Sequence, residues 1–262
     1  MTAQLHPSMP FDSYLALDRL SASGAKSILR APAVYQYERT HPFEPTAAMQ
    51  LGTLVHRLVL ERDAGDYEII EGGYGKGKRE ADVRERGLIP VTQETWDTAH
   101  NMALAVDEHP LAADLLSVGE PEQTILWDQD GVPMKARMDW VRDGVVVDLK
   151  TTASANPNDF RRSIATFGYH VQQAVYEAAY AALNGTAPRF VFVAVESRAP
   201  HLVSVIELDE EAVGRGRVLM DRAVDLYREC TASGEWPGYS EINRVSLPQW
   251  ALFDQDEEEI II

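Results

Sequence analysis

Two aspartates and a lysine are the residues in this sequence whose types and spacing could support chemistry. A typical two-residue hairpin turn, Asp143-Gly144, connects two runs of alternating polar and apolar residues. A turn of this length pairs Asp139 with Asp148, and directly opposed side chains lie about 4.5–5.5 Å apart at Cβ. Because side chains alternate along a strand, Lys150 is predicted to share the face of Asp148.

Two opposed carboxylates repel each other unless something neutralises them. A hard divalent cation with oxygen ligands, Mg²⁺ or Mn²⁺, is the direct remedy. A lysine beside such a cation can orient or deprotonate an attacking water and stabilise negative charge on a phosphate. The alternative is a solvated strand face on which Arg137 and Lys150 only form ion pairs with the two aspartates. The hairpin alone does not decide between these interpretations.

The hairpin belongs to a longer region with a period of two residues. Runs 122–127, 134–141 and 145–150 predict three consecutive antiparallel strands, because turn signals separate them. The polar face of the hairpin is predicted to carry Lys135, Arg137, Asp139, Val146, Asp148 and Lys150. The other face is predicted to form the core, with Met134, Ala136, Met138, Trp140, Val145, Val147 and Leu149.

Helical periodicity and capping residues place helices before and after these strands. Ser21 and Thr46 are candidate N-caps. Helices are predicted at about 21–30, 46–61, 92–108, 157–165, 168–183 and 209–230, and further strands at 189–196 and 202–207. This order predicts an α/β fold, in which helices flank a central mixed sheet with a three-strand antiparallel meander.

Composition narrows the class of protein. The chain has 262 residues, of which 45% are hydrophobic, enough to bury a substantial core. The single cysteine, Cys230, excludes a disulfide framework, a cysteine-based zinc site and a four-cysteine iron–sulfur cluster. The N-terminus carries no signal-like region, and the longest apolar run, 190–195, is far too short for a bilayer span. We therefore expect a soluble cytoplasmic protein without membrane contact.

The charge balance argues against one class of partner. With 24 basic and 41 acidic residues the chain has a net charge of −17, whereas non-specific nucleic-acid binders usually carry basic surfaces. A protein of this charge that acts on nucleic acid is expected to keep its acids on the outside. Its basic residues Arg137, Lys150, Arg161 and Arg162 would then surround a cleft.

Several blocks carry a family resemblance. Asp139 followed by Asp148-Leu149-Lys150 resembles the D…(D/E)-x-K signature of the PD-(D/E)XK nuclease superfamily. The segment 52–56 resembles the G-x-x-x-H helix, and Gln172 with Tyr176 the Q-x-x-x-Y helix, of the branch that contains RecB-type nuclease domains. With the late block WPGYSEINRVSLPQWA, these segments look like the exonuclease VIII (RecE-type) nuclease domain of phages and prophages, over about 21–251.

The resemblance implies a role for each matching residue. Its metal ligands would be His56, Asp139, Asp148 and the carbonyl of Leu149. Lys150 would activate the water or stabilise the pentavalent phosphate, and Gln172 and Tyr176 would be catalytic residues facing the same DNA strand. Glu122 matches an acidic position that can help to hold a second metal, but Glu120 is close enough to leave this choice open, and a surface acid at a strand end is the alternative. Gly52, one turn before His56, would let the metal or a strand approach closely.

The resemblance also implies a PD-(D/E)XK nuclease-like core and a reaction. A Mg²⁺-dependent exodeoxyribonuclease, with Mn²⁺ as a substitute, would hydrolyse linear double-stranded DNA from its ends, 5′ to 3′, leaving 3′ single strands for recombination by annealing. A single-strand annealing protein would be a partner, and the chain would assemble into a homo-oligomeric ring. The alternatives are another repair nuclease of the superfamily, whether an endonuclease or helicase-linked, and a catalytically silent DNA-end or recombinase-binding protein.

The remaining expectations concern the ends and the basic residues. We expect a loosely ordered segment over 1–20, a single nuclease domain with an N-terminal helical extension over 21–253, and an acidic tail over 254–262 that is either disordered or docks a partner. Arg161 and Arg162 follow the DLKTT strand and are placed to meet phosphates. Lys76, Lys78 and Arg79, in a glycine-rich stretch, either contact the DNA backbone or belong to a solvated loop of mixed charge.

Overall fold

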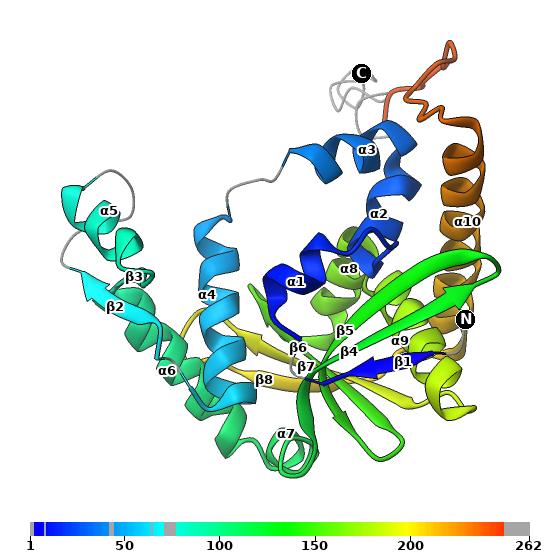
Figure 1. Cartoon of the computed structure of the whole chain (residues 1–262). Coiled ribbons are helices and arrows are strands. Elements are labelled where there is room, and N and C mark those ends of the chain that lie inside the picture. The colour runs from blue at the N-terminus through cyan, green and yellow to red at the C-terminus, as the bar shows by residue number, and fades with distance from the viewer. Residues whose placement is uncertain (1–2, 8, 42–44, 64, 71–76, 249–262) are drawn as a thin grey trace, which may run out of the picture.

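A six-stranded mixed sheet forms the centre of the structure, a computed structural model that describes residues 3–7, 9–41, 45–63, 65–70 and 77–248 (Figure 1). The strand order is β1-β4-β5-β6-β7-β8, and neighbouring strands are antiparallel except for the parallel pair β6 and β7. The predicted central sheet and its antiparallel meander, β4 to β6, are therefore confirmed. The strands are β1 (Gln4–His6), β4 (Glu120–Gln129), β5 (Val132–Arg142), β6 (Val145–Thr152), β7 (Arg189–Glu196) and β8 (Val203–Ile206).

One face of the sheet is covered by helices from both ends of the chain. They are α2 (Ala22–Arg30), α8 (Pro157–Phe167), α9 (Tyr169–Asn184) and α10 (Glu210–Ser233), and α3 (Pro32–Thr40) packs against α2 and α10 at the outer end of this layer. Helix α9 is the central one, because its apolar side chains lie between the sheet and α10. This first cluster of buried side chains includes Leu20, Ile28, Met134, Met138, Phe160, Val175 and Met220.

The opposite face is covered by the middle of the chain. Helix α4 (Ala47–His56) continues into a π-helical turn, η1 (Arg57–Glu61), and is followed by α6 (Gln93–Glu108) and α7 (Pro110–Leu115). The second cluster of buried side chains includes Leu54, Val59, Met102, Leu115, Val147, Leu149 and Val193. Within the described residues, none of the helices combines the length and apolar composition that crossing a bilayer requires.

The expected division of the hairpin into a core face and a polar face is wrong, because helices cover both faces of the sheet. Val146 belongs to the first cluster and Val147 to the second, and Asp148 is fully buried. The expected core face is itself divided, because Met138 packs in the first cluster whereas Trp140 packs in the second. Side-chain alternation therefore breaks at Asp139, between these two residues.

The first 20 residues, expected to be loosely ordered, hold a strand and a helix in the structure. Strand β1 pairs with β4, and helix α1 (Phe11–Ala16) follows. The Lys135 ammonium donates to the carbonyls of Tyr14, Leu15 and Leu17, at 2.8, 3.2 and 2.8 Å. A cation at the C-terminal end of a helix is electrostatically favourable there. Sequence periodicity missed these short elements, because their partners lie more than 100 residues away.

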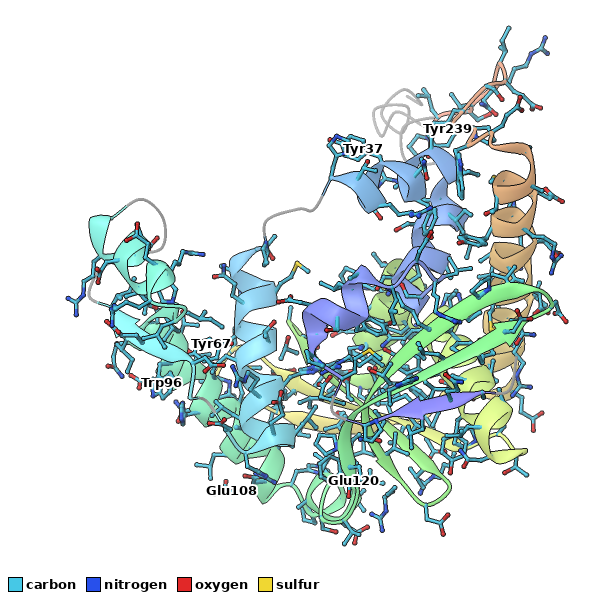
Figure 2. The ribbon with its side chains drawn as sticks, viewed as in Figure 1. Tyr37, Tyr67, Trp96, Glu108, Glu120 and Tyr239 are labelled. Atoms are coloured by element: carbon cyan, nitrogen blue, oxygen red, sulfur yellow. The ribbon has the colours of Figure 1, made fainter. Side chains whose placement is uncertain are left out.

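A small unit separate from the main sheet lies against α6. Parallel strands β2 (Tyr67–Ile70) and β3 (Ile89–Thr92) are connected through α5 (Lys78–Glu85), and α5 lies at the outer end of this unit in Figure 1. The rings of Tyr67 and Trp96 lie 6.5 Å apart where the unit meets α6 (Figure 2). The sequence did not predict this unit. Lys76 and the acidic tail 254–262 lie outside the described residues.

Helix α4 approaches the end of β6 through a residue without a side chain. A Cβ atom placed on Gly52 would lie 3.1 Å from the Thr151 hydroxyl oxygen, a contact tighter than most Cβ atoms make. The expected close approach is therefore to the strand. His56 lies one turn further along α4, so the same contact also sets the position of its ring.

Gly52→Val is expected to lower the free energy of unfolding by about 1–3 kcal/mol, because the added methyl groups overpack the contact between α4 and β6. Gly214→Val on α10 is the matched control, since no atom lies within 4 Å of a Cβ placed there. Urea denaturation of both variants measures the difference. A loss at Gly52 no larger than that at Gly214 would contradict the close approach.

Candidate active site

The site forms where β5 separates from β6, while β5 stays paired with β4. The hairpin has the predicted register, with Arg142 opposite Val145 and Trp140 opposite Val147, and the ladder between β5 and β6 then ends. The expected backbone pairing of Asp139 with Asp148 is therefore not made. Instead, the Asp139 carboxylate accepts a hydrogen bond of 2.9 Å from the Leu149 amide. A side chain thus takes the place of a strand carbonyl, and the two strands diverge beyond it.

His56 reaches this point from the end of α4. Its Nε2 atom donates to the Leu149 carbonyl at 2.8 Å, so Nδ1 is the ring nitrogen that keeps a lone pair. Nδ1 lies 3.7 Å from Asp139 Oδ2. Burial and the nearby charge of Lys150 lower the pKa of His56, which favours the neutral ring that binds metals. The expected metal-ligand role of the Leu149 carbonyl stays a prediction, and this oxygen retains a second lone pair.

Glu122 completes the group from the other side of Asp139. The pairs Pro121–Trp140 and Gln123–Met138 place Glu122 opposite Asp139, and the Glu122 backbone is left-handed, with φ of 55°. The Glu122 carboxylate forms an ion pair with Arg137. Burial and the charge of Asp139 raise the pKa of Glu122.

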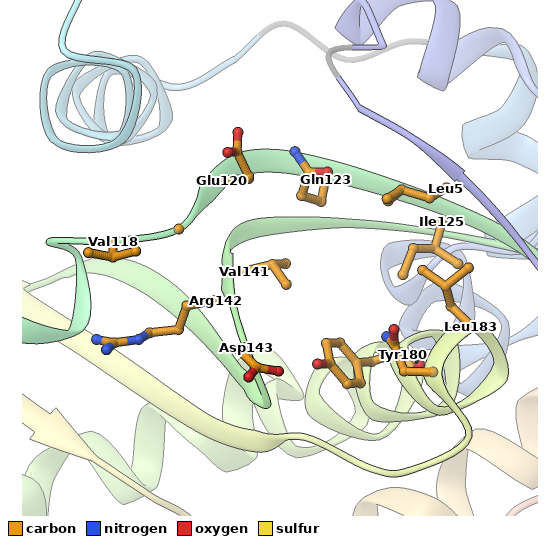
Figure 3. Close-up of a pocket in the computed structure, with 12 residues that line it drawn as sticks. Leu5, Val118, Glu120, Gln123, Ile125, Val141, Arg142, Asp143, Tyr180 and Leu183 are labelled. Carbon is orange, nitrogen blue, oxygen red and sulfur yellow. Dashed lines mark hydrogen bonds between the residues drawn. The ribbon is translucent and has the colours of Figure 1, made fainter.

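Glu120, the alternative acid, lies elsewhere. It is exposed and borders a hollow of about 340 Å³ between β4 and the end of α9, where Tyr180 and Leu183 form the opposite wall (Figure 3). The structure therefore places Glu122, and not Glu120, beside Asp139. No sequence signal separated the two acids, because the distinction comes from the left-handed turn of the backbone at Glu122.

His56, Glu122 and Asp139 form a group that fits a divalent cation. One ligand atom from each residue can be chosen so that all three lie within 4.8 Å of one another. Carboxylate oxygens and a neutral imidazole nitrogen are both common ligands of divalent metal ions. Burial and the charge of Asp148 raise the pKa of Asp139 to about 7, so further positive charge would stabilise the ionised carboxylate. A divalent cation would supply it.

Asp148 lies beside this group but has its own partners, and its expected role as a metal ligand stays a prediction. It is fully buried, forms an ion pair with Lys150, and accepts a hydrogen bond of 2.6 Å from the Gln172 amide. The Lys150 ammonium also lies 4.9 Å from the centre of the Tyr169 ring. Asp148 and Asp139, the adjacent carboxylate, together raise the pKa of Lys150, so this lysine stays charged.

Other predicted site residues lie in places that differ from the expectation. Gln172 and Tyr176 are both buried, and Gln172 binds Asp148, so these side chains face inward and do not present a surface to a DNA strand. Arg137 was expected to bind DNA. It instead forms an ion pair with Glu122 and donates a hydrogen bond of 2.5 Å to the Met9 carbonyl.

The other predicted DNA contacts that the structure describes lie on two different helices. Arg161 and Arg162 are exposed on α8, which follows β6. Lys78 and Arg79 belong to α5, in the separate small unit. Sequence reasoning missed Lys26 on α2, which interacts electrostatically with both Lys150 and Asp148. Nothing in the local pattern of the helix 22–30 distinguished this lysine from an ordinary surface residue.

Comparisons with known proteins give a family and a fold. Residues 21–245 match the family model described as PDDEXK-like domain of unknown function (DUF3799). The structure is similar to that of a candidate exonuclease from Eubacterium rectale, with a TM-score of 0.68 and 16% identity over 94% of this chain and 98% of that one. An alkaline exonuclease from Laribacter hongkongensis has a TM-score of 0.34 at 12% identity, covering 82% of this chain and 91% of its own. No curated protein matches the chain significantly.

Glu122→Gln is expected to weaken Mg²⁺ or Mn²⁺ binding about 10-fold or more, because the amide removes one anionic ligand. Glu120→Gln is the matched control and should bind the cation as the wild type does, since Glu120 lies outside the group. Isothermal titration calorimetry on the metal-free proteins measures both affinities. Equal losses in the two variants would contradict the assignment of Glu122.

The raised pKa of Asp139 has a consequence for stability. A folded state that binds the carboxyl proton more tightly than the unfolded chain is stabilised at acidic pH, and it loses that contribution as the pH rises towards about 7. Asp139→Asn does not titrate, so its unfolding temperature in a chelator should fall less than that of the wild type between about pH 5 and pH 8. An equal fall in both proteins would show that Asp139 is not the titrating group.

Proposed function

Because this chain belongs to the PDDEXK-like domain family DUF3799, we propose that it is a metal-dependent DNA nuclease that hydrolyses phosphodiester bonds. Membership confirms the resemblance to the PD-(D/E)XK superfamily, whereas the narrower resemblance to exonuclease VIII stays a prediction. The observation that carries the proposal is the group of His56, Glu122 and Asp139, placed directly beside the Asp148–Lys150 pair. A nuclease of this superfamily needs both parts, a place for a cation and a lysine next to it.

The chain's own residues divide the work between holding a cation and handling the phosphate. His56, Glu122 and Asp139 would hold the cation, which when bound polarises a phosphoryl oxygen and lowers the pKa of a water. Asp148 keeps Lys150 protonated, since the pKa of Lys150 is raised. Of the two predicted roles of Lys150, this favours stabilisation of negative charge on the phosphate over removal of a proton from water. Gln172 orients Asp148 and thereby Lys150.

The charge around the site removes the objection that the net charge of −17 raised. Three acids, Glu122, Asp139 and Asp148, lie near three cations, of which Arg137 and Lys150 form ion pairs and Lys26 forms none among the described residues. The site is therefore neutral by formal charge in an acidic protein, and a divalent cation would make it positive. A phosphate is then attracted to this place, while the acidic surface elsewhere repels DNA.

The finer parts of the proposal rest on the sequence resemblance. They are degradation of linear double-stranded DNA from its ends, 5′ to 3′ polarity, and production of 3′ single strands for recombination with an annealing protein. Mg²⁺ as the cation, with Mn²⁺ as its substitute, and a homo-oligomeric ring belong with them. The fold similarity to a candidate exonuclease is compatible with end-directed cleavage, but the fold also suits an endonuclease.

Lys150→Ala is expected to lower the cleavage rate of end-labelled linear duplex DNA about 10²–10³-fold, because it removes charge stabilisation at the phosphate. The assay contains Mg²⁺ and is repeated with covalently closed circles, which an exonuclease leaves intact. Arg189 is an exposed cation that forms an ion pair with Glu207. The variant Arg189→Gln therefore controls for the loss of a positive charge away from the site.

Each other outcome has a definite reading. Cleavage of circles would overturn the exonuclease proposal and leave an endonuclease. Unchanged activity of Lys150→Ala would overturn the assignment of the site. Absence of cleavage by the wild type with either cation would favour a silent DNA-binding protein.

A further inference from the structure

A lysine from the N-terminal helices reaches the edge of the candidate active site. Lys26 lies on α2, and its aliphatic chain crosses Gly168, the residue between α8 and α9. A Cβ atom placed on Gly168 would lie 2.8 Å from Lys26 Cδ, so only a glycine leaves room for the lysine to pass. Gly168 also has a left-handed φ of 64°, which disfavours other residues. The backbone here is thus shaped around the lysine side chain.

The path of Lys26 leads towards Lys150. Tyr169 is the residue next to Gly168, and the Lys150 ammonium lies 4.9 Å from the centre of the Tyr169 ring. The electrostatics agree with this placement, because burial and the positive charge of Lys150 lower the pKa of Lys26 to about 8, while Asp148 acts in the opposite direction. The Lys26 side chain therefore approaches the side of the site on which Tyr169 and Lys150 lie.

Only one of these two cations has an anionic partner. Asp148 is shared between Lys150 and Gln172, and Asp139 and Glu122 face His56 and Arg137. Within the part of the chain that the structure describes, no carboxylate forms an ion pair with Lys26. Placing a second, unneutralised cation beside a charged lysine is unfavourable unless an anion binds between them. Lysine acts as a point charge towards phosphate groups, which makes a phosphate the fitting anion.

We propose that Lys26 binds a phosphate of the substrate strand adjacent to the phosphate on which Lys150 acts, and so positions the strand for cleavage. This inference rests on the proposed nuclease function and adds to it a residue outside the resemblance blocks of the site. Arg30 lies one helical turn beyond Lys26 on the same side of α2 and is exposed. It adds a second positive charge on this side of α2.

The test compares Lys26→Gln with Lys26→Arg in the full chain. DNA binding is measured by fluorescence anisotropy with a labelled duplex in a chelator, across a range of salt concentrations, and cleavage is measured with Mg²⁺. Loss of one phosphate contact should weaken binding about 10-fold and reduce the slope of log affinity against log salt by about one. KM should rise by a similar factor with a smaller change in kcat, and Lys26→Arg should restore both.

Two controls separate a phosphate contact from a structural effect. Arg222→Gln removes an exposed cation from α10 and should leave affinity and salt slope unchanged. Mg²⁺ affinity, measured by calorimetry, should be the same in Lys26→Gln and the wild type, because Lys26 is no metal ligand. If Lys26→Gln fails to fold, Lys26→Met provides the second variant, since it keeps an unbranched aliphatic chain across Gly168 and removes only the charge, and it should raise KM.

The failure of this inference differs from the failure of the proposed function. A Lys26→Gln variant with wild-type affinity, salt slope and KM would overturn the inference, while loss of cleavage in Lys150→Ala would leave the nuclease proposal standing. A wild-type chain that cleaves no DNA with either cation would overturn both. Equal losses in Lys26→Gln and Lys26→Arg, with lowered Mg²⁺ affinity, would assign Lys26 to the structure of the site and also overturn the inference.

Discussion

The hydrogen bond from the Leu149 amide to the Asp139 carboxylate is the interaction on which the site depends. Two strands that separate normally leave backbone donors without partners, and a buried unpaired amide is costly. Here the carboxylate satisfies the amide, so β5 and β6 can diverge inside the protein. The same bond turns Asp139 towards His56 and Glu122. The opening of the sheet and the gathering of possible metal ligands thus have one physical cause.

Neighbouring groups hold this arrangement from three directions. Helix α4 comes close to β6 at Gly52 and brings His56 to the Leu149 carbonyl. The left-handed backbone at Glu122 turns that carboxylate towards Arg137. On the far side, Gln172 holds Asp148 within the first apolar cluster. Because these contacts come from different elements, the fold itself positions the side chains of the candidate site.

The sequence predicted what local patterns and short turns determine. The register of the hairpin followed from Asp143-Gly144, and strands 189–196 and 202–207 lie close to their predicted places. The burial of both faces of β6 was not predictable in this way, because it depends on helices that come from distant parts of the chain. The separation at Asp139 was missed for a related reason, since nothing in a period of two residues indicates that a side chain will replace a backbone acceptor. Lys26 was missed because nothing in the pattern of the helix 22–30 distinguishes it from an ordinary surface lysine.

The contacts of the N-terminal segment determine when the site can form during synthesis of the chain. Arg137 binds both the Met9 carbonyl and Glu122, and Lys135 holds the end of α1, so the first residues of the chain have their partners on β5. During synthesis these residues leave the ribosome long before β5 does, and they cannot be held in place until it follows. The candidate metal-binding group is therefore assembled only after β5 has been made. A truncated product that ends before β5 has no means of acquiring it.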